Sequence, residues 1–123
     1  MCKALQKAHY FNVVHGDIKP QNIFVKRDNT VKVGDFGISI ITGEKAEVSS
    51  KGTISYMSPE TFRGISTSKR DIWALGCVIH EVCGLKRTFV AENNHIARLR
   101  AMIEGEDPCR IPENYSDGLA TLV

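Results

Sequence analysis

Features that would point to a membrane, a nucleic acid or a secreted scaffold are scarce in this sequence of 123 residues. The longest apolar run, Ile72 to Ile79, stops at His80 and is far shorter than the roughly 20 residues of a membrane span. Sixteen basic and fourteen acidic residues leave a formal charge of +2. Because no basic run or acidic tail is present, the charge argues against nucleic acid or a membrane surface as a partner.

Cysteine pairs and a leader segment are lacking as well. The four cysteines form no C-x-x-C pair and have no histidine at zinc-finger spacing, so we expect reduced, mostly buried thiols. No apolar segment follows Met1, so no secretory signal is visible. These absences favour a cytoplasmic protein. The length suits one modest domain, and no internal repeat or linker divides it.

Hydrophobic spacing predicts a mixed fold in which helices dominate. Apolar residues recur at helical spacing from Met1 to Phe11, so the chain is expected to open in an amphipathic helix. Two β-prone runs, 23–25 and 31–33, are separated by a polar turn, which predicts a hairpin. The segment from Asp71 to Leu85 is apolar on more than one face and is predicted to be the central buried helix.

The other segments are polar or only weakly periodic. From Ser39 to Tyr56 the sequence lacks sustained periodicity, which predicts an exposed loop with a function of its own. Asn93 or Asn94 can cap a further helix that Gly105 would end. Ser116 marks the beginning of one more helix.

Two short polar clusters flank the predicted hairpin. The first, over 15–22, carries Asp17 and Asn22, and the second carries Asp35. Because the hairpin folds its second strand back on its first, Asp35 returns to the neighbourhood of Asn22, where both can face one hard cation. Phosphoryl transfer needs a carboxylate near the attacking hydroxyl and oxygen ligands for magnesium. The clusters therefore predict a phosphoryl-transfer site.

Each of these residues also has a purely structural interpretation. Asp17 and Asp35 could be turn carboxylates, Lys19 a solvated lysine and Asn22 a turn cap. The presence of both clusters in register argues against this interpretation. For Ser49 an ordinary loop hydroxyl remains as good an interpretation as a functional one.

The order of the motifs resembles the catalytic half of the protein kinase family. The pattern is His15-x-Asp17-x-Lys19-x-x-Asn22, then Asp35-Phe36-Gly37 and Ser58-Pro59-Glu60. Details of the second half, among them Asp71-Ile72-Trp73 and Ile111-Pro112, resemble the NIMA-related (Nek) kinases of the serine/threonine branch. The resemblance implies an α+β, mainly α fold: the C-terminal lobe of a kinase-like fold, with a short β-hairpin beside the catalytic loop.

The resemblance also implies a reaction and its reagents. Asp17 would accept the proton of a serine or threonine hydroxyl on a protein substrate. Lys19 would place a positive charge beside the transferring phosphate of ATP. Asn22 and Asp35 would ligate Mg²⁺ through oxygen.

An activation segment and two structural supports are implied in addition. Phe36 would pack inward to set active and inactive states, and Thr53 would hydrogen-bond toward the catalytic aspartate and lysine. His15 would be a structural brace, and Asp71 would anchor the catalytic-loop backbone. The residues implied in the activation segment are Phe36, Gly37, Ser49, Thr53 and Glu60.

One departure from the family pattern is Gly16. Family members usually carry arginine there, and that arginine pairs with a phosphate on the activation loop. Glycine cannot make this contact. We therefore expect phosphorylation at Ser49, Ser50 or Thr53 to activate only weakly by this route.

The second departure is that residues 1–123 hold no glycine-rich phosphate loop, strand lysine or partner glutamate. We therefore expect a partial kinase domain without the N-terminal lobe and the final helices, in which Glu60 would be a buried carboxylate without its arginine. An alternative is a catalytically inactive kinase-like fragment that binds a regulatory protein through the activation segment and the helix that ends at Gly105. A metal-binding or hydrolytic domain would need a positioned water and more ligands.

Overall fold

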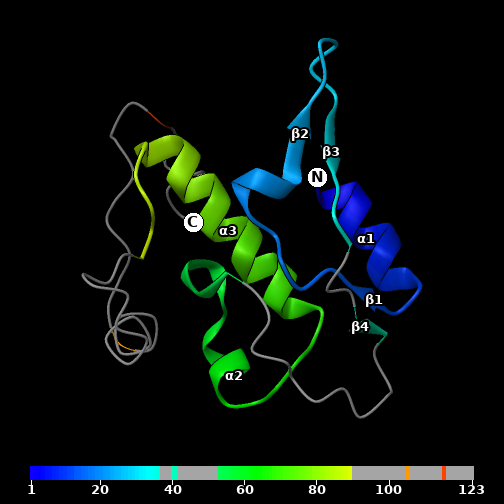
Figure 1. The fold of residues 1–123 in the computed structure, drawn as a ribbon, viewed down its shortest axis with the longest axis vertical. Coiled ribbons are helices and arrows are strands. Elements are labelled where there is room, and N and C mark those ends of the chain that lie inside the picture. The colour runs from blue at the N-terminus through cyan, green and yellow to red at the C-terminus, as the bar shows by residue number, and fades with distance from the viewer. Residues whose placement is uncertain (37–39, 42–52, 90–104, 106–114, 116–123) are drawn as a thin grey trace.

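A computed structural model describes residues 1–36, 40–41, 53–89, 105 and 115 of the chain. Helix α3 (Lys69–Gly84) is the longest described element and runs through the centre of the described part (Figure 1). Helix α1 (Cys2–Tyr10), the short helix α2 (Pro59–Phe62) and two small antiparallel sheets complete the fold. The two predicted helices, at the beginning of the chain and in its centre, are thus confirmed.

Helix α1 buries one side of an amphipathic segment. Leu5 is 1 % exposed, whereas most of its neighbours on the helix are exposed. The helix ends before Asn12, which has a φ of 57°. Asparagine tolerates this left-handed conformation better than most residues, and the chain reverses there into strand β1 (Val13–Val14).

Helix α3 is buried on much of its surface but not all around. The prediction of a buried central helix is confirmed for Ala74, Leu75 and Val78, which are each at most 6 % exposed. Ile72 and Val82 are 50 % and 62 % exposed. Burial on more than one face was predicted from their apolar character. That prediction is wrong for the side of the helix that carries these two residues.

The two β-prone runs pair as an antiparallel hairpin. Strand β2 (Ile23–Val25) lies beside β3 (Val31–Val33), with Ile23 opposite Val33. At the tip Asn29 has a φ of 59°, a conformation suited to its turn. The hairpin projects from the rest of the described chain, at the top of Figure 1.

The prediction of a loop from Ser39 to Tyr56 is wrong at both ends. Strand β4 (Ile40–Ile41) pairs antiparallel with β1, and η2 (Ile54–Tyr56) is a 3₁₀ turn. A strand of two residues has too little length to show alternation, and its pairing depends on a distant partner. Residues 42–52 lie outside the described part.

One apolar cluster joins the elements that surround the first polar cluster. It brings together side chains from α1, from residues 15–22, from η2 and from α3. Its buried members are Leu5, Ile18, Tyr56, Ala74, Leu75, Cys77, Val78 and Phe89. Because Ile18 belongs to this core, the polar residues on both sides of it are held against α3.

The described cysteines are free thiols. Cys77 and Cys83 are buried and Cys2 is exposed. Burial raises the pKa of the Cys77 thiol to about 12, so this group stays protonated at neutral pH. Cys109, the part before Gly105 of the helix predicted to end there, and the helix predicted from Ser116 onward fall outside the described residues. Gly105 itself is helical and exposed. Among the residues described, no helix has the length and apolar character needed to cross a bilayer.

We expect Leu85→Gly to stabilise the fold. Leu85 follows α3 with a φ of 53° and is 90 % exposed, so glycine relieves backbone strain without loss of buried apolar area. The gain should be about 1 kcal/mol, which raises the melting temperature by roughly 4 °C. Leu85→Ala, which retains the β-carbon, should melt near the wild type. A Leu85→Gly variant that melts no higher than Leu85→Ala in circular dichroism would contradict this explanation.

Candidate active site

The first polar cluster forms a loop between β1 and β2, which we call the HGD loop (residues 15–22). Its shape depends on Asp71 in the first turn of α3, which is 1 % exposed. The N–H groups of His15 and Gly16 donate to the two carboxylate oxygens of Asp71, each at 2.9 Å. His9 Nε2 on α1 lies 2.8 Å from Asp71 Oδ2. One buried carboxylate therefore connects α3, α1 and the beginning of the loop.

His15 connects the HGD loop to the chain after β3. Its side chain is fully buried, and Nε2 donates to the carbonyl oxygen of Gly34 at 2.9 Å. Nδ1 accepts the N–H of Asp17 at 3.2 Å. Because one ring nitrogen faces an acceptor and the other a donor, the imidazole is the neutral Nε2–H tautomer. His15 is thus placed as a brace, with both nitrogens occupied.

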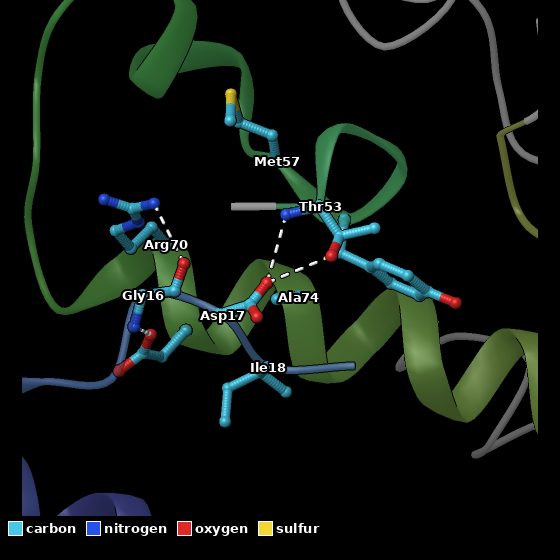
Figure 2. A pocket seen from close by; sticks show the side chains of 9 residues that line it. Gly16, Asp17, Ile18, Thr53, Met57, Arg70 and Ala74 are labelled. Atoms are coloured by element: carbon cyan, nitrogen blue, oxygen red, sulfur yellow. Dashed lines mark hydrogen bonds between the residues drawn. The ribbon is translucent and has the colours of Figure 1, made fainter. Parts of the chain in front are cut away.

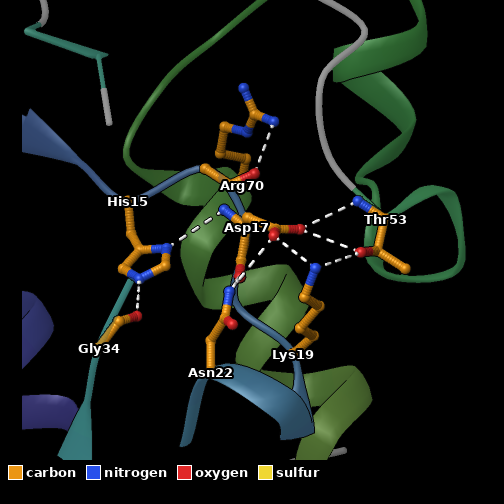
Figure 3. A network of polar contacts seen from close by, with 8 residues as sticks. His15, Asp17, Lys19, Asn22, Gly34, Thr53 and Arg70 are labelled. Atoms are coloured by element: carbon orange, nitrogen blue, oxygen red, sulfur yellow. Dashed lines mark hydrogen bonds and ion pairs between the residues drawn. The ribbon is translucent and has the colours of Figure 1, made fainter. Parts of the chain in front are cut away.

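Asp17, Lys19 and Thr53 form a compact polar group (Figure 3). The backbone N–H and the hydroxyl of Thr53 donate to Asp17 Oδ1 at 3.0 and 3.1 Å. Lys19 Nζ lies 2.6 Å from Asp17 Oδ2 and donates to Thr53 Oγ1 at 3.0 Å. Thr53 comes from a distant segment, so tertiary structure completes the group. A phosphate on the Thr53 hydroxyl would lie against the Asp17 carboxylate, so this residue is not suited to activating phosphorylation.

The charge state of Asp17 follows from these contacts. Burial raises the pKa of its carboxyl, but the hydrogen bonds from Lys19 and Thr53 together exceed that effect. The pKa therefore lies below its ordinary value. Asp17 is an ionised carboxylate at neutral pH, in position to accept a proton.

Asn22 and Asp35 come together as the hairpin predicts. The N–H of Gly34 donates to the carbonyl oxygen of Asn22 at 3.0 Å, which extends the pairing of β2 and β3 by one residue. Asp35 follows directly and has a φ of 59°. Asn22 Nδ2 donates to the carbonyl oxygen of Asp17 at 2.8 Å. That bond orients the amide through its nitrogen.

An amide oxygen and a carboxylate are donors that suit a hard cation such as Mg²⁺. This cation binds proteins through few side chains when nucleotide phosphates supply its other ligands. The chemistry of Asn22 and Asp35 therefore fits the group that the sequence implied for them.

Two predicted features of the site need correction. Phe36 was expected to pack inward, but its ring is 44 % exposed and lies 4.5 Å from the His15 ring, centroid to centroid. Glu60 was expected to be a buried carboxylate, but it is half-buried in the first turn of α2. Its predicted cost as a buried, unpaired charge is reduced accordingly. Gly37 and Ser49 lie outside the described residues.

One contact of the hairpin and one residue of the site were missed by the sequence analysis. Phe24 on β2 is 55 % exposed, and a β-carbon at Gly34 would lie 2.8 Å from its ring. An aromatic residue on a short strand gives no signal for such a contact. Arg70 precedes Asp71, and its Nη2 donates to the carbonyl oxygen of Gly16 at 3.1 Å. Arginine at the beginning of a helix is usually exposed, so its pattern suggested nothing.

Comparisons with known proteins show a family to which the whole chain is similar. A family model described as protein kinase domain matches residues 1–123. Serine/threonine-protein kinase Nek1 of Mus musculus is 41 % identical over 126 residues, which cover 100 % of this chain and 10 % of that protein. Mouse serine/threonine-protein kinase Nek2 is 40 % identical, with 90 % and 25 % covered.

The G2-specific protein kinase nimA of Emericella nidulans is 38 % identical, with 95 % of this chain and 17 % of that protein covered. The chain therefore spans between a tenth and a quarter of the length of these relatives. The likeness extends over nearly the whole chain, including the HGD loop.

We expect Asp71→Asn to destabilise the fold by about 3 kcal/mol, because the buried N–H groups of His15 and Gly16 cannot both keep an acceptor. The free energy of unfolding in urea measures this loss. Asp28→Asn changes an exposed carboxylate at the hairpin tip and should alter stability by less than about 0.5 kcal/mol. Equal stability of the two variants would show that Asp71 does not hold the loop.

We expect Lys19→Met to raise the pKa of Asp17, since burial then acts with fewer opposing contacts. A carboxyl whose folded pKa lies below its unfolded value of about 3.9 stabilises the fold above that value. The contribution is lost as the pH falls through the folded pKa. The acid-unfolding midpoint should therefore move to higher pH in Lys19→Met.

Carbon-13 NMR titration of the Asp17 carboxyl measures the first effect, and circular dichroism measures the second. Lys26→Met is the control, because Lys26 lies 3.8 Å from the exposed Asp28 and not at the site. An unchanged pKa of Asp17 in Lys19→Met would contradict the assignment.

Proposed function

Since the chain belongs to the protein kinase family, we propose that it carries the catalytic half of a serine/threonine protein kinase. Its reaction transfers the γ-phosphoryl group of ATP to a serine or threonine hydroxyl of a protein. The kinase names of the relatives support the reaction and the acceptor class. We place the ATP-binding lobe outside residues 1–123, because this sequence has no glycine-rich loop or strand lysine of the family type.

The arrangement of Asp17, Lys19 and Thr53 is the observation that carries the proposal. Thr53 holds one carboxylate oxygen of Asp17 through two hydrogen bonds, so the carboxylate is oriented before any substrate binds. Asp17 then accepts the proton of the substrate hydroxyl as that oxygen bonds to the γ-phosphorus. The bond from the γ-phosphorus to the bridging oxygen of ADP breaks in the same step.

Lys19 can contact two different groups during this reaction. Its ammonium group lies 2.6 Å from the Asp17 carboxylate and contributes to the low pKa of Asp17. When ATP is present, the ammonium group can neutralise an oxygen of the transferring phosphate instead. Its departure would raise the pKa of Asp17 at the stage where Asp17 must take up a proton.

Asn22 and Asp35 are the residues that would hold Mg²⁺. When bound, this ion neutralises charge on the nucleotide phosphates. The contribution of the chain would be to bring the two oxygen donors into one neighbourhood through the pairing of β2 and β3. The bond from Asn22 Nδ2 to the carbonyl oxygen of Asp17 keeps Asn22 close to the proton acceptor.

We expect Asp17→Asn, in a complete kinase that contains this segment, to lower kcat by about 10²- to 10⁴-fold, the usual contribution of a general base. KM for ATP should change little, because Asn22 and Asp35 are retained. Transfer of radiolabelled phosphate to a protein substrate measures both constants. Asp28→Asn, at the exposed hairpin tip, is the matched control and should keep wild-type activity. Unchanged phosphate transfer by Asp17→Asn would contradict the assignment of Asp17 as the proton acceptor.

A further inference from the structure

Arg70 is a buried cation to which the proposed reaction assigns no role. Its side chain is 5 % exposed, and it lies in the first turn of α3 directly before Asp71. Burial lowers the pKa of the guanidinium, while the charges of Asp71, Asp17 and Glu60 act in the opposite direction. Arginine nevertheless stays charged at physiological pH. A charge removed from water needs specific contacts to offset its lost hydration.

Two hydrogen bonds show where this guanidinium acts. Nη2 donates to the carbonyl oxygen of Gly16 at 3.1 Å, a contact drawn in Figure 2, and Nη1 donates to Ser66 Oγ at 3.2 Å. The N–H of Gly16 in turn donates to Asp71 Oδ1. Adjacent residues of α3 therefore hold both polar backbone groups of Gly16. The next residue along the chain is Asp17, so its position depends on this double contact.

Gly16 is the point of the HGD loop where such support matters most. Its φ of 80° lies in the left-handed region, and glycine has more backbone freedom to lose on ordering than any other residue. An arginine at this position would restrict the backbone and could pair with a phosphate. The chain has a glycine at this position instead, and the guanidinium that contacts its peptide belongs to Arg70 on α3.

We infer that Arg70 is a positioning residue that holds the Gly16 peptide and so aims Asp17 without a phosphate on the activation segment. This inference rests on the proposed kinase function. The other use of a buried guanidinium would be to bind a phosphate. The charges around Arg70 disfavour it, because Asp71, Asp17 and Glu60 act on the same group and would repel a phosphate.

The test uses the complete kinase, with and without phosphatase treatment. Arg70→Met removes both hydrogen bonds and keeps the apolar stem, so kcat should fall about tenfold to 100-fold, the usual effect of losing a bond from a charged donor. KM for ATP should stay near the wild-type value, since the nucleotide ligands are untouched. Phosphatase treatment should leave the kcat of the wild type unchanged.

Matched variants separate positioning from charge and stability. Lys69→Met removes a cation from the same helical turn without touching the loop, and should keep wild-type kcat. Arg70→Lys keeps the charge but reaches one acceptor, and should have an intermediate kcat. Gly16→Arg in the Arg70→Met background should recover activity only when Ser49 or Ser50 is phosphorylated. Gly16→Ala in that background carries the same backbone strain without the guanidinium and should not recover.

Wild-type kcat in a folded Arg70→Met variant would overturn the inference, and so would loss of wild-type activity after phosphatase treatment. If Arg70→Met does not fold, Arg70→Lys replaces it, and an unchanged kcat there has the same meaning. Unchanged phosphate transfer by Asp17→Asn would instead contradict the proposed function.

In that case hydrogen exchange tests the role of Arg70 without an activity measurement. Faster exchange of the 15–17 amides in Arg70→Met than in Lys69→Met supports the positioning role, and equal exchange overturns it.

Discussion

The buried carboxylate of Asp71 accepts N–H groups from two consecutive residues of the HGD loop, and the geometry of the site depends on this contact. A carboxylate removed from water is costly unless its oxygens are satisfied by hydrogen bonds. The N–H groups of His15 and Gly16, together with His9 from α1, satisfy it. Each of those groups is in turn buried or nearly so, and needs an acceptor. The arrangement is therefore stable only when all members are in place.

Beyond this anchor, side-chain contacts brace the loop at His15 and at Asn22. His15 reaches across to Gly34, so the brace on the HGD loop also sets the end of the hairpin from which Asp35 follows. Asn22 closes the loop through the carbonyl oxygen of Asp17. Asp17 consequently has little freedom of its own. Such preorganisation is what phosphoryl transfer requires, because the protein contributes mainly position and charge.

Sequence reasoning succeeded where the signal was local. The helices α1 and α3 and the hairpin β2–β3 were visible from periodicity and turn residues. The proximity of Asn22 and Asp35 followed from the hairpin alone. Sequence reasoning failed where a segment was too short to show a periodicity, or where the surroundings of a residue come from distant segments. Strand β4 has too few residues to show alternation, and the exposure of Phe36 depends on what surrounds it.

The sequence by itself determined which reagents are present and in what order, because short motifs such as 15–22 are fixed by covalent spacing. The family resemblance implied that Thr53 meets the Asp17 carboxylate, and the structure confirms it. Only tertiary structure decided that Arg70 meets the carbonyl of Gly16. Neither contact has a periodicity, since each joins segments that are far apart in the chain. The sequence showed that position 16 lacks an arginine. The fold showed that α3 delivers a guanidinium to the same peptide.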